Sequence, residues 1–151
     1  MKYVLILFFF LFSCKGKIDN ELKDSILKIL AENQKVHVLL LEKSETIPES
    51  KALLISIKEA RSLASKNEDI QKQLDKMEST LTNINSKDKE AFFESLSSFS
   101  ELLTDILKAN QIRTEYNKFY CPMVAKYWIA KGEVVENPYA PEMRECGELV
   151  K

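Results

Sequence analysis

The chain contains no glycine between Lys17 and Lys131, and over most of that stretch its apolar residues recur every three or four positions. This spacing lines one face of an α-helix with apolar side chains. The lack of glycine disfavours hairpin turns, and with them strands, in the same region. The pattern predicts four successive helices, over residues 19–42, 47–65, 68–83 and 88–109.

Local signals indicate where these helices begin and how they pack. Asp19 or Asn20 can cap the first helix, and Thr46-Ile47-Pro48-Glu49 has the form of a capping box for the second. Each apolar stripe covers only about two heptads, whereas an extended coiled coil needs about three or four. We therefore expect an all-α fold, an antiparallel bundle of about four helices with an irregular C-terminal segment, residues 116–151, packed on it.

The N-terminus has the pattern of a bacterial targeting signal. Lys2 supplies the positive charge and Val4–Phe12 the apolar core, which is too short to cross a bilayer. Leu11-Phe12-Ser13-Cys14 resembles a lipobox, in which the cysteine receives a lipid and becomes the mature N-terminus. The alternative is an ordinary secreted chain with an odd free thiol at Cys14. We expect a lipoprotein signal peptide over residues 1–13, a lipidated end and tether over 14–18, and a single domain over 19–151.

The lipid would hold the domain on a membrane of the cell envelope, facing the periplasm, and the sequence leaves open which membrane. The 22 basic and 23 acidic residues balance, so the chain lacks the positive charge of a nucleic-acid-binding protein. Enzyme motifs are missing as well: there is no phosphate-binding glycine loop and no H-E-x-x-H, and a Ser-His-Asp triad would depend on the lone His37. We therefore expect a non-enzymatic protein that binds no nucleic acid.

The C-terminal segment concentrates sulfur. Cys121-Pro122-Met123 and Met143-Arg144-Glu145-Cys146 supply two thiols and two thioethers, and the second pair is spaced to lie on one side of a helical turn. Thiolate and thioether groups prefer soft ions. Cys121, Met123, Met143 and Cys146 are therefore candidate ligands of Cu(I) or Ag(I).

A disulfide between Cys121 and Cys146 explains the same two cysteines without a metal. Two thiols tend to pair in an oxidising compartment, and closing a loop of about 25 residues stabilises a fold by roughly 3 kcal/mol. The metal-bound and disulfide states can also alternate with redox conditions, and a third alternative is that both cysteines are free structural thiols. Trp128 and Tyr139 have two interpretations too, because they can pack the segment onto the helices or form a surface for a protein partner.

The order of motifs in this segment carries a resemblance. Tyr-Cys-Pro-Met at 120–123, Tyr-Trp at 127–128, Asn-Pro-Tyr at 137–139 and Met-x-x-Cys-Gly at 143–147 together resemble the bacterial domain-of-unknown-function family 3347. Its members occur as small exported proteins or lipoproteins and on periplasmic adaptor subunits of copper and silver efflux pumps. The resemblance implies a helical periplasmic domain for heavy-metal handling, with its sulfur-bearing positions at Cys121, Met123, Met143 and Cys146. Val124-Ala125-Lys126 and Ala140-Pro141-Glu142 depart from the family pattern, which bears on loop conformation.

We therefore expect a lipid-anchored, non-enzymatic domain that binds or hands over Cu(I) or Ag(I) in connection with heavy-metal efflux. Its partners would be the membrane, through the lipid on Cys14, and a periplasmic adaptor or efflux protein. The alternative is a disulfide-stapled interaction module of the envelope, without a metal role.

Overall fold

A computed structural model describes residues 18–43, 46–82 and 88–150. The expected signal peptide, the tether up to residue 17 and Cys14 lie outside these residues. Within the described part of the chain, no helix combines the length and the apolar character needed to cross a membrane.

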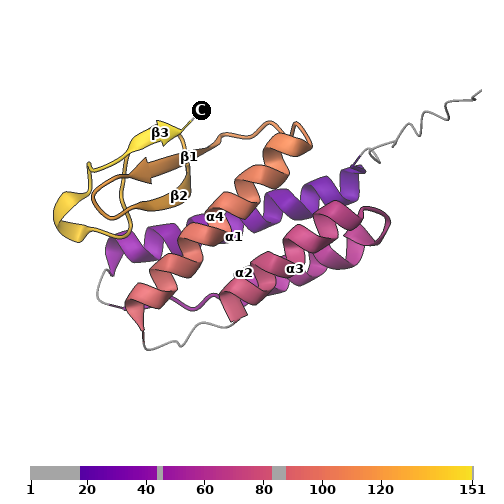
Figure 1. Cartoon of the computed structure of the whole chain (residues 1–151), viewed down its shortest axis with the longest axis horizontal. Coiled ribbons are helices and arrows are strands. Elements are labelled where there is room, and N and C mark those ends of the chain that lie inside the picture. Colours follow the sequence, from indigo (N-terminus) through magenta and orange to yellow (C-terminus); the bar gives the residue numbers. More distant parts are fainter. Residues whose placement is uncertain (1–17, 44–45, 83–87, 151) are drawn as a thin grey trace, which may run out of the picture.

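In the described residues, four α-helices follow one another up and down along the long axis of the molecule (Figure 1), as the apolar spacing predicts. The predicted cap of the first helix at Asp19 is confirmed, and Asp88 caps the fourth helix in the same way. The Asp19 carboxylate accepts a hydrogen bond from the Leu22 amide at 2.8 Å, and the Asp88 carboxylate accepts one from the Ala91 amide at 3.1 Å. The helices are α1 (Asn20–Glu42), α2 (Lys51–Leu63, extended by a 3-10 turn, Ala64–Lys66), α3 (Glu68–Thr82) and α4 (Lys89–Ala109).

The start of the second helix differs from the prediction. α2 begins at Lys51, and the flanking residue Ser50 makes no side-chain cap. The Thr46 hydroxyl instead donates to the Lys43 carbonyl at 3.2 Å. Because that bond points back toward α1, the expected capping box at residues 46–49 does not form.

The expectation of a purely helical fold is wrong in the C-terminal segment. This segment holds a three-stranded antiparallel sheet in the order β2-β1-β3, with Phe119 opposite Trp128 in one pairing and opposite Leu149 in the other. The β1–β2 hairpin turns through four residues without glycine, because Ala125 adopts a positive φ of 51°. The fold is therefore mostly helical with a small sheet. The strands are β1 (Tyr116–Cys121), β2 (Lys126–Lys131) and β3 (Glu148–Val150).

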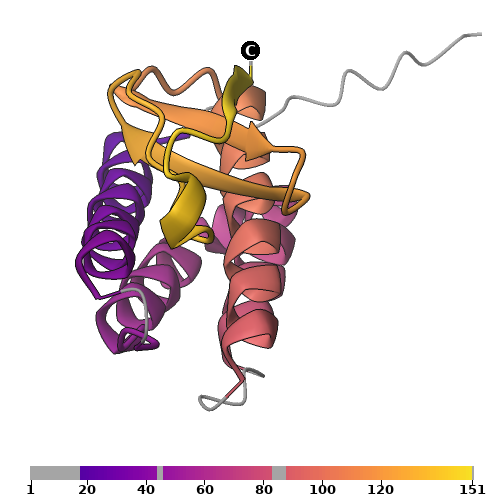
Figure 2. The same cartoon turned by 90° about the vertical axis from the view of Figure 1, so that its left-hand side faces the viewer.

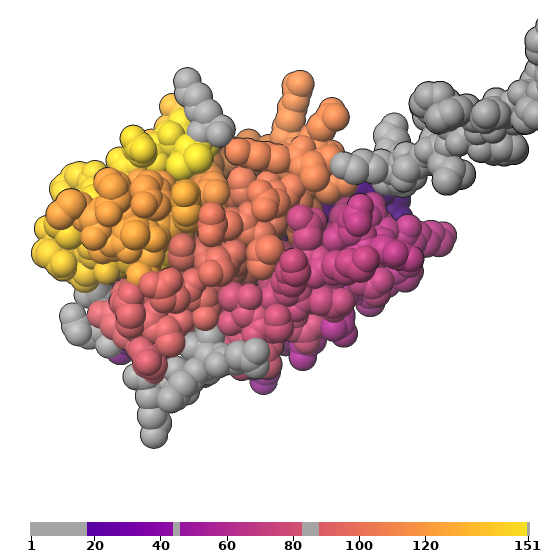
Figure 3. All heavy atoms as spheres, in the orientation of Figure 1, coloured from indigo at the N-terminus to yellow at the C-terminus, as the bar shows by residue number. Residues whose placement is uncertain are grey.

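The sheet lies across α1 and α4, the first and last helices of the row. Figure 2 shows these two helices on either side with the sheet spanning them, and β2 is the strand that packs against both. In the space-filling view the atoms of the C-terminal segment gather at one end of the molecule (Figure 3), where α1 ends and α4 begins. The C-terminal segment thus closes one end of the helical layer.

Side chains from the two helices form hydrogen bonds with the backbone groups on the outer edge of β2. The Tyr127 amide donates to the Ser97 hydroxyl at 2.9 Å, and the Asn33 amide group donates to the Ile129 carbonyl at 3.0 Å. The Lys131 amide donates to the Gln34 side-chain oxygen at 2.9 Å. An edge strand otherwise exposes unpaired backbone groups, so these bonds hold β2 against α1 and α4.

Candidate functional site

The fold brings Cys121 and Cys146 together as a disulfide. Cys121 is the last residue of β1 and is fully buried, whereas Cys146 lies just before β3 and is partly exposed. Their Cα atoms are 5.6 Å apart although the residues are 25 positions apart in the chain. The covalent bond joins the hairpin end of the sheet to the loop that leads into β3.

The two methionines of the predicted sulfur set lie on the segments next to these cysteines. Met123 lies in the hairpin turn that follows Cys121, and the residue is 72% exposed. Met143 ends a short 3-10 turn, and its carbonyl accepts a hydrogen bond from the Cys146 amide at 3.0 Å. Among the described residues, no three side chains of His, Cys, Asp or Glu gather in a way that could hold a metal ion. Thiolate and thioether groups would suit a soft ion once the disulfide is reduced.

Asn137 and Arg144 hold the loop that carries Cys146. Asn137 is fully buried, and its side chain donates to the Cys146 carbonyl at 3.1 Å and accepts from the Tyr139 amide at 2.9 Å. The Asn137 amide donates to the Arg144 carbonyl at 2.8 Å, and the Arg144 guanidinium donates to the Asn137 carbonyl at 2.6 Å. Every polar group of Asn137 is thus used to close this loop.

Arg144 also ties the loop to the end of α1. Its second guanidinium nitrogen donates to the carbonyls of Leu41 at 3.2 Å and Leu40 at 3.4 Å. These belong to the last turn of α1, whose carbonyls have no partner within the helix. A cation at this position is also favoured by the helix dipole.

The aromatic residues of the motifs form the core under the sheet. Trp128 is 2% exposed and stacks on Phe119 with ring centroids 5.5 Å apart. Tyr139 is 6% exposed and meets both Trp128 and Phe93 of α4 edge to face. In this structure Trp128 and Tyr139 therefore pack the segment onto the helices and do not form the surface expected for a protein partner.

The Tyr139 hydroxyl adds a polar tie to this core. It donates to the Tyr127 carbonyl at 2.8 Å, and burial, together with the nearby Glu94 carboxylate, raises the pKa of Tyr139 above its ordinary value. The hydroxyl therefore keeps its proton and remains a hydrogen-bond donor at neutral pH. It connects the loop at 132–147 to β2.

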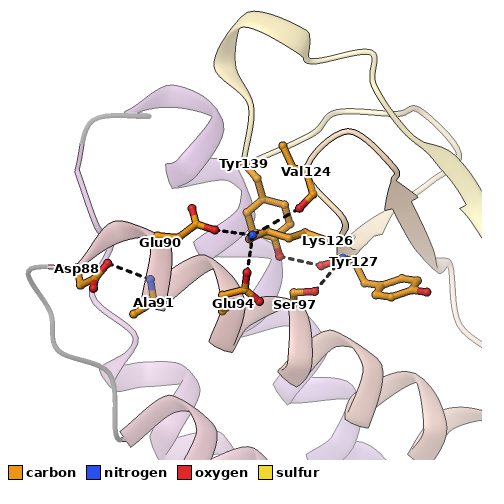
Figure 4. Close-up of polar contacts among 9 residues, drawn as sticks. All are labelled: Asp88, Glu90, Ala91, Glu94, Ser97, Val124, Lys126, Tyr127 and Tyr139. Atoms are coloured by element: carbon orange, nitrogen blue, oxygen red, sulfur yellow. Dashed lines mark hydrogen bonds and ion pairs between the residues drawn. The ribbon is translucent and has the colours of Figure 1, made fainter.

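Lys126 anchors the first residue of β2 to α4. Its ammonium group lies between the carboxylates of Glu90 at 2.6 Å and Glu94 at 2.8 Å, and it also approaches the Val124 carbonyl (Figure 4). Burial of the ammonium group opposes its charge, but the hydrogen bonds and charges of the two glutamates outweigh that effect and raise the pKa of Lys126. The lysine is therefore a charged structural contact between strand and helix.

His37 of α1 has a structural contact as well. The side chain is 3% exposed, and its Nε2 atom lies 2.9 Å from the Glu136 carbonyl. Burial lowers the pKa of His37, so the ring is neutral at neutral pH and Nε2 carries the proton that it donates to the carbonyl. No protein partner reaches its buried Nδ1 atom within the described part of the chain.

The residues that build this site are mostly absent from the sequence-based prediction. Asn33 and Ser97 could have been noticed, because each places a polar group in the apolar stripe of a helix. Asn137 and Arg144 were visible as motif residues only, since no local pattern reveals which carbonyls they reach. The buried Lys126 has no signal in the sequence.

Comparison of the chain with models of protein families, with curated proteins and with solved structures yields no match.

Proposed function

We propose that this protein is a non-enzymatic, lipid-anchored protein of the cell envelope that captures Cu(I) or Ag(I) and hands the ion to a component of metal efflux. The observation that carries the proposal is the convergence of sulfur. Two thiols that are 25 positions apart in the chain meet at one end of the sheet, with Met123 two positions after Cys121 and Met143 three positions before Cys146. The order of the motifs and its family resemblance agree with this role.

The ion-binding form is the reduced one. The disulfide has no thiolate to offer, so a dithiol reductant or a thiol–disulfide exchange protein must first deliver two electrons and two protons to it. Binding of Cu(I) between the two sulfurs then releases the thiol protons. Because Cys121 is buried and Cys146 is partly exposed, the ion would arrive from the side of Cys146.

The thioethers extend the binding set without adding charge. The exposed Met123 can meet an arriving ion before it reaches the thiolates, and Met143 lies one turn before Cys146. Thioether ligands favour Cu(I) and Ag(I), whereas Zn²⁺ needs about four nitrogen, oxygen or thiolate ligands. We therefore propose selectivity for monovalent soft ions.

Anaerobic titration of the reduced full-length chain with Cu(I), in competition with a chromogenic chelator, tests this function. All proteins carry Cys14→Ser, so that Cys121 and Cys146 are the remaining thiols. We expect one Cu(I) per chain and a loss of affinity of at least about 100-fold, or ~2.7 kcal/mol, in Cys121→Ser or Cys146→Ser. When Zn²⁺ is used in the titration in place of Cu(I), we expect no comparable binding.

Methionine variants separate the thioether contribution. Met123→Leu and Met143→Leu should each weaken Cu(I) binding by about tenfold, because each removes one soft ligand of the set. Met77→Leu is the matched control, since Met77 is fully buried in the core of the helices. Unchanged affinity in both cysteine variants would overturn the ligand assignment.

A further inference from the structure

The loop around Cys146 is held by hydrogen bonds in addition to the disulfide. Its carbonyl is bound by Asn137, Asn137 is bound twice by Arg144, and Arg144 is bound to the end of α1. None of these bonds involves a sulfur atom. They remain available when the disulfide is reduced.

The other cysteine is held just as independently. Cys121 pairs with Lys126 at the end of the β1–β2 ladder, and Lys126 is fixed to α4 by Glu90 and Glu94. The loop and β2 are joined in turn by the hydrogen bond from the Tyr139 hydroxyl to the Tyr127 carbonyl. Cys146 is therefore tied to α1 and Cys121 to α4, and the Tyr139–Tyr127 hydrogen bond links the two sides, all by contacts that do not depend on the disulfide.

We propose that Asn137 and Arg144 are positioning residues that keep the Cys121 and Cys146 thiols side by side in the reduced protein. When two thiols are held in this way, the effective concentration of one thiol at the position of the other is high. The pair can then close to a disulfide, or bind one soft ion, without first ordering a loop. The second consequence rests on the proposed function, whereas the first is a property of the thiols alone.

A thermodynamic cycle separates positioning from general stabilisation. A residue that stabilises the oxidised and reduced folds equally leaves the thiol–disulfide equilibrium unchanged when it is replaced. A residue that orders the reduced loop has a different effect, because its loss makes the open dithiol more mobile and ring closure less favourable. The equilibrium with glutathione therefore reports on positioning and is insensitive to a merely structural role.

The test measures that equilibrium in full-length chains that carry Cys14→Ser. Each chain that is reduced takes two electrons and two protons from two glutathione molecules, which leave as one glutathione disulfide. We expect Asn137→Ala to lower the effective concentration of the two thiols by about tenfold or more. Arg144→Lys, which keeps the charge but loses the paired donors, should lower it to a smaller extent.

Matched controls come from the same part of the chain. Asn117→Ala removes an asparagine whose side chain also donates to a backbone carbonyl, that of Gly132 at 2.7 Å, at the opposite end of β1 from Cys121. Arg113→Lys changes an exposed arginine between α4 and β1. In both controls the effective concentration of the two thiols should stay within about twofold of its value in the unsubstituted protein.

The proposal is overturned if the effective concentration of the two thiols in Asn137→Ala and in Arg144→Lys stays within the range of the controls. Circular dichroism checks that the reduced variants keep their helices, and if Asn137→Ala does not, Arg144→Lys alone decides. If the positioning variants shift the glutathione equilibrium but the unsubstituted reduced protein takes up no Cu(I), the positioning role stands and the proposed metal function fails.

Discussion

Gly147 shows how closely the motif-bearing loop fits the core beneath it. Its backbone has a φ of +155°, and a Cβ atom at this position would lie 2.5 Å from Cη2 of Trp128 and 3.2 Å from Cγ1 of Val135. Atoms at such distances overlap, and the ring that would have to move is stacked on Phe119. A residue without a side chain is therefore required directly after Cys146.

Replacement of Gly147 by alanine should lower the free energy of unfolding by about 2–3 kcal/mol, because steric overlap adds to backbone strain. Gly132→Ala is the control: its φ is +80°, but no atom lies within 4 Å of the added carbon. It should cost about 1 kcal/mol from strain alone. Urea unfolding monitored by helical circular dichroism measures both, and equal losses would show that the loop moves away from Trp128 without penalty.

At the scale of elements, the central feature is a strand whose outer edge is completed by helices. Asn33 and Gln34 of α1 and Ser97 of α4 provide the hydrogen bonds that a further strand would otherwise make. These three bonds explain why β2 lies between two helices without recruiting another strand. They also explain why the polar residues Asn33 and Ser97 occupy buried positions, because their side chains have hydrogen-bond partners there.

The same elements show what the sequence can and cannot predict. The helices and the caps at Asp19 and Asp88 were predictable, because apolar spacing and capping depend on residues a few positions apart. The hairpin was missed because the absence of glycine was given too much weight, although Ala125 can adopt the positive φ of the turn. The aromatic residues of β1 and β2 were the available strand signal. The contact of Arg144 with α1 was not predictable, since the carbonyls that its guanidinium reaches lie about a hundred residues earlier in the chain.

Asn33→Leu tests the role of the helices at the strand edge. The variant leaves the Ile129 carbonyl buried without its donor, so we expect a loss of about 1–3 kcal/mol in the free energy of unfolding. Gln34→Leu is the matched control, because the hydrogen bond from the Lys131 amide is exposed and water can replace the lost oxygen. Its loss should stay below about 0.5 kcal/mol. If Asn33→Leu is as stable as the unsubstituted protein, the Ile129 carbonyl does not need the helix.

For the whole molecule, the C-terminal segment connects the first helix to the last. Lys126 attaches it to α4, Arg144 attaches it to α1, and the disulfide closes it on itself. The disulfide is the covalent member of this set. The noncovalent contacts do not involve the sulfur atoms and remain available when that bond is opened.

Reduction should therefore destabilise the protein without unfolding it. The chain-entropy estimate for a loop of this length is about 3 kcal/mol, which should appear as a lower urea midpoint with the helical signal retained in the absence of urea. The double variant Cys121→Ser, Cys146→Ser should have the lower midpoint already and should not respond to a reductant. A response that persists in the double variant would mean that another group is the target of the reductant.

The long reach of Arg144 has a consequence for the order in which the protein is completed. α1 is the first of these helices to leave the ribosome, yet Arg144, which binds the carbonyls of Leu40 and Leu41, follows them by 104 and 103 positions. At about 5–20 residues per second, the end of α1 waits roughly 5–20 seconds for its final contact. The end of α1 therefore reaches its native contacts only after Arg144 has been synthesised, and until then its last carbonyls depend on water for their hydrogen bonds.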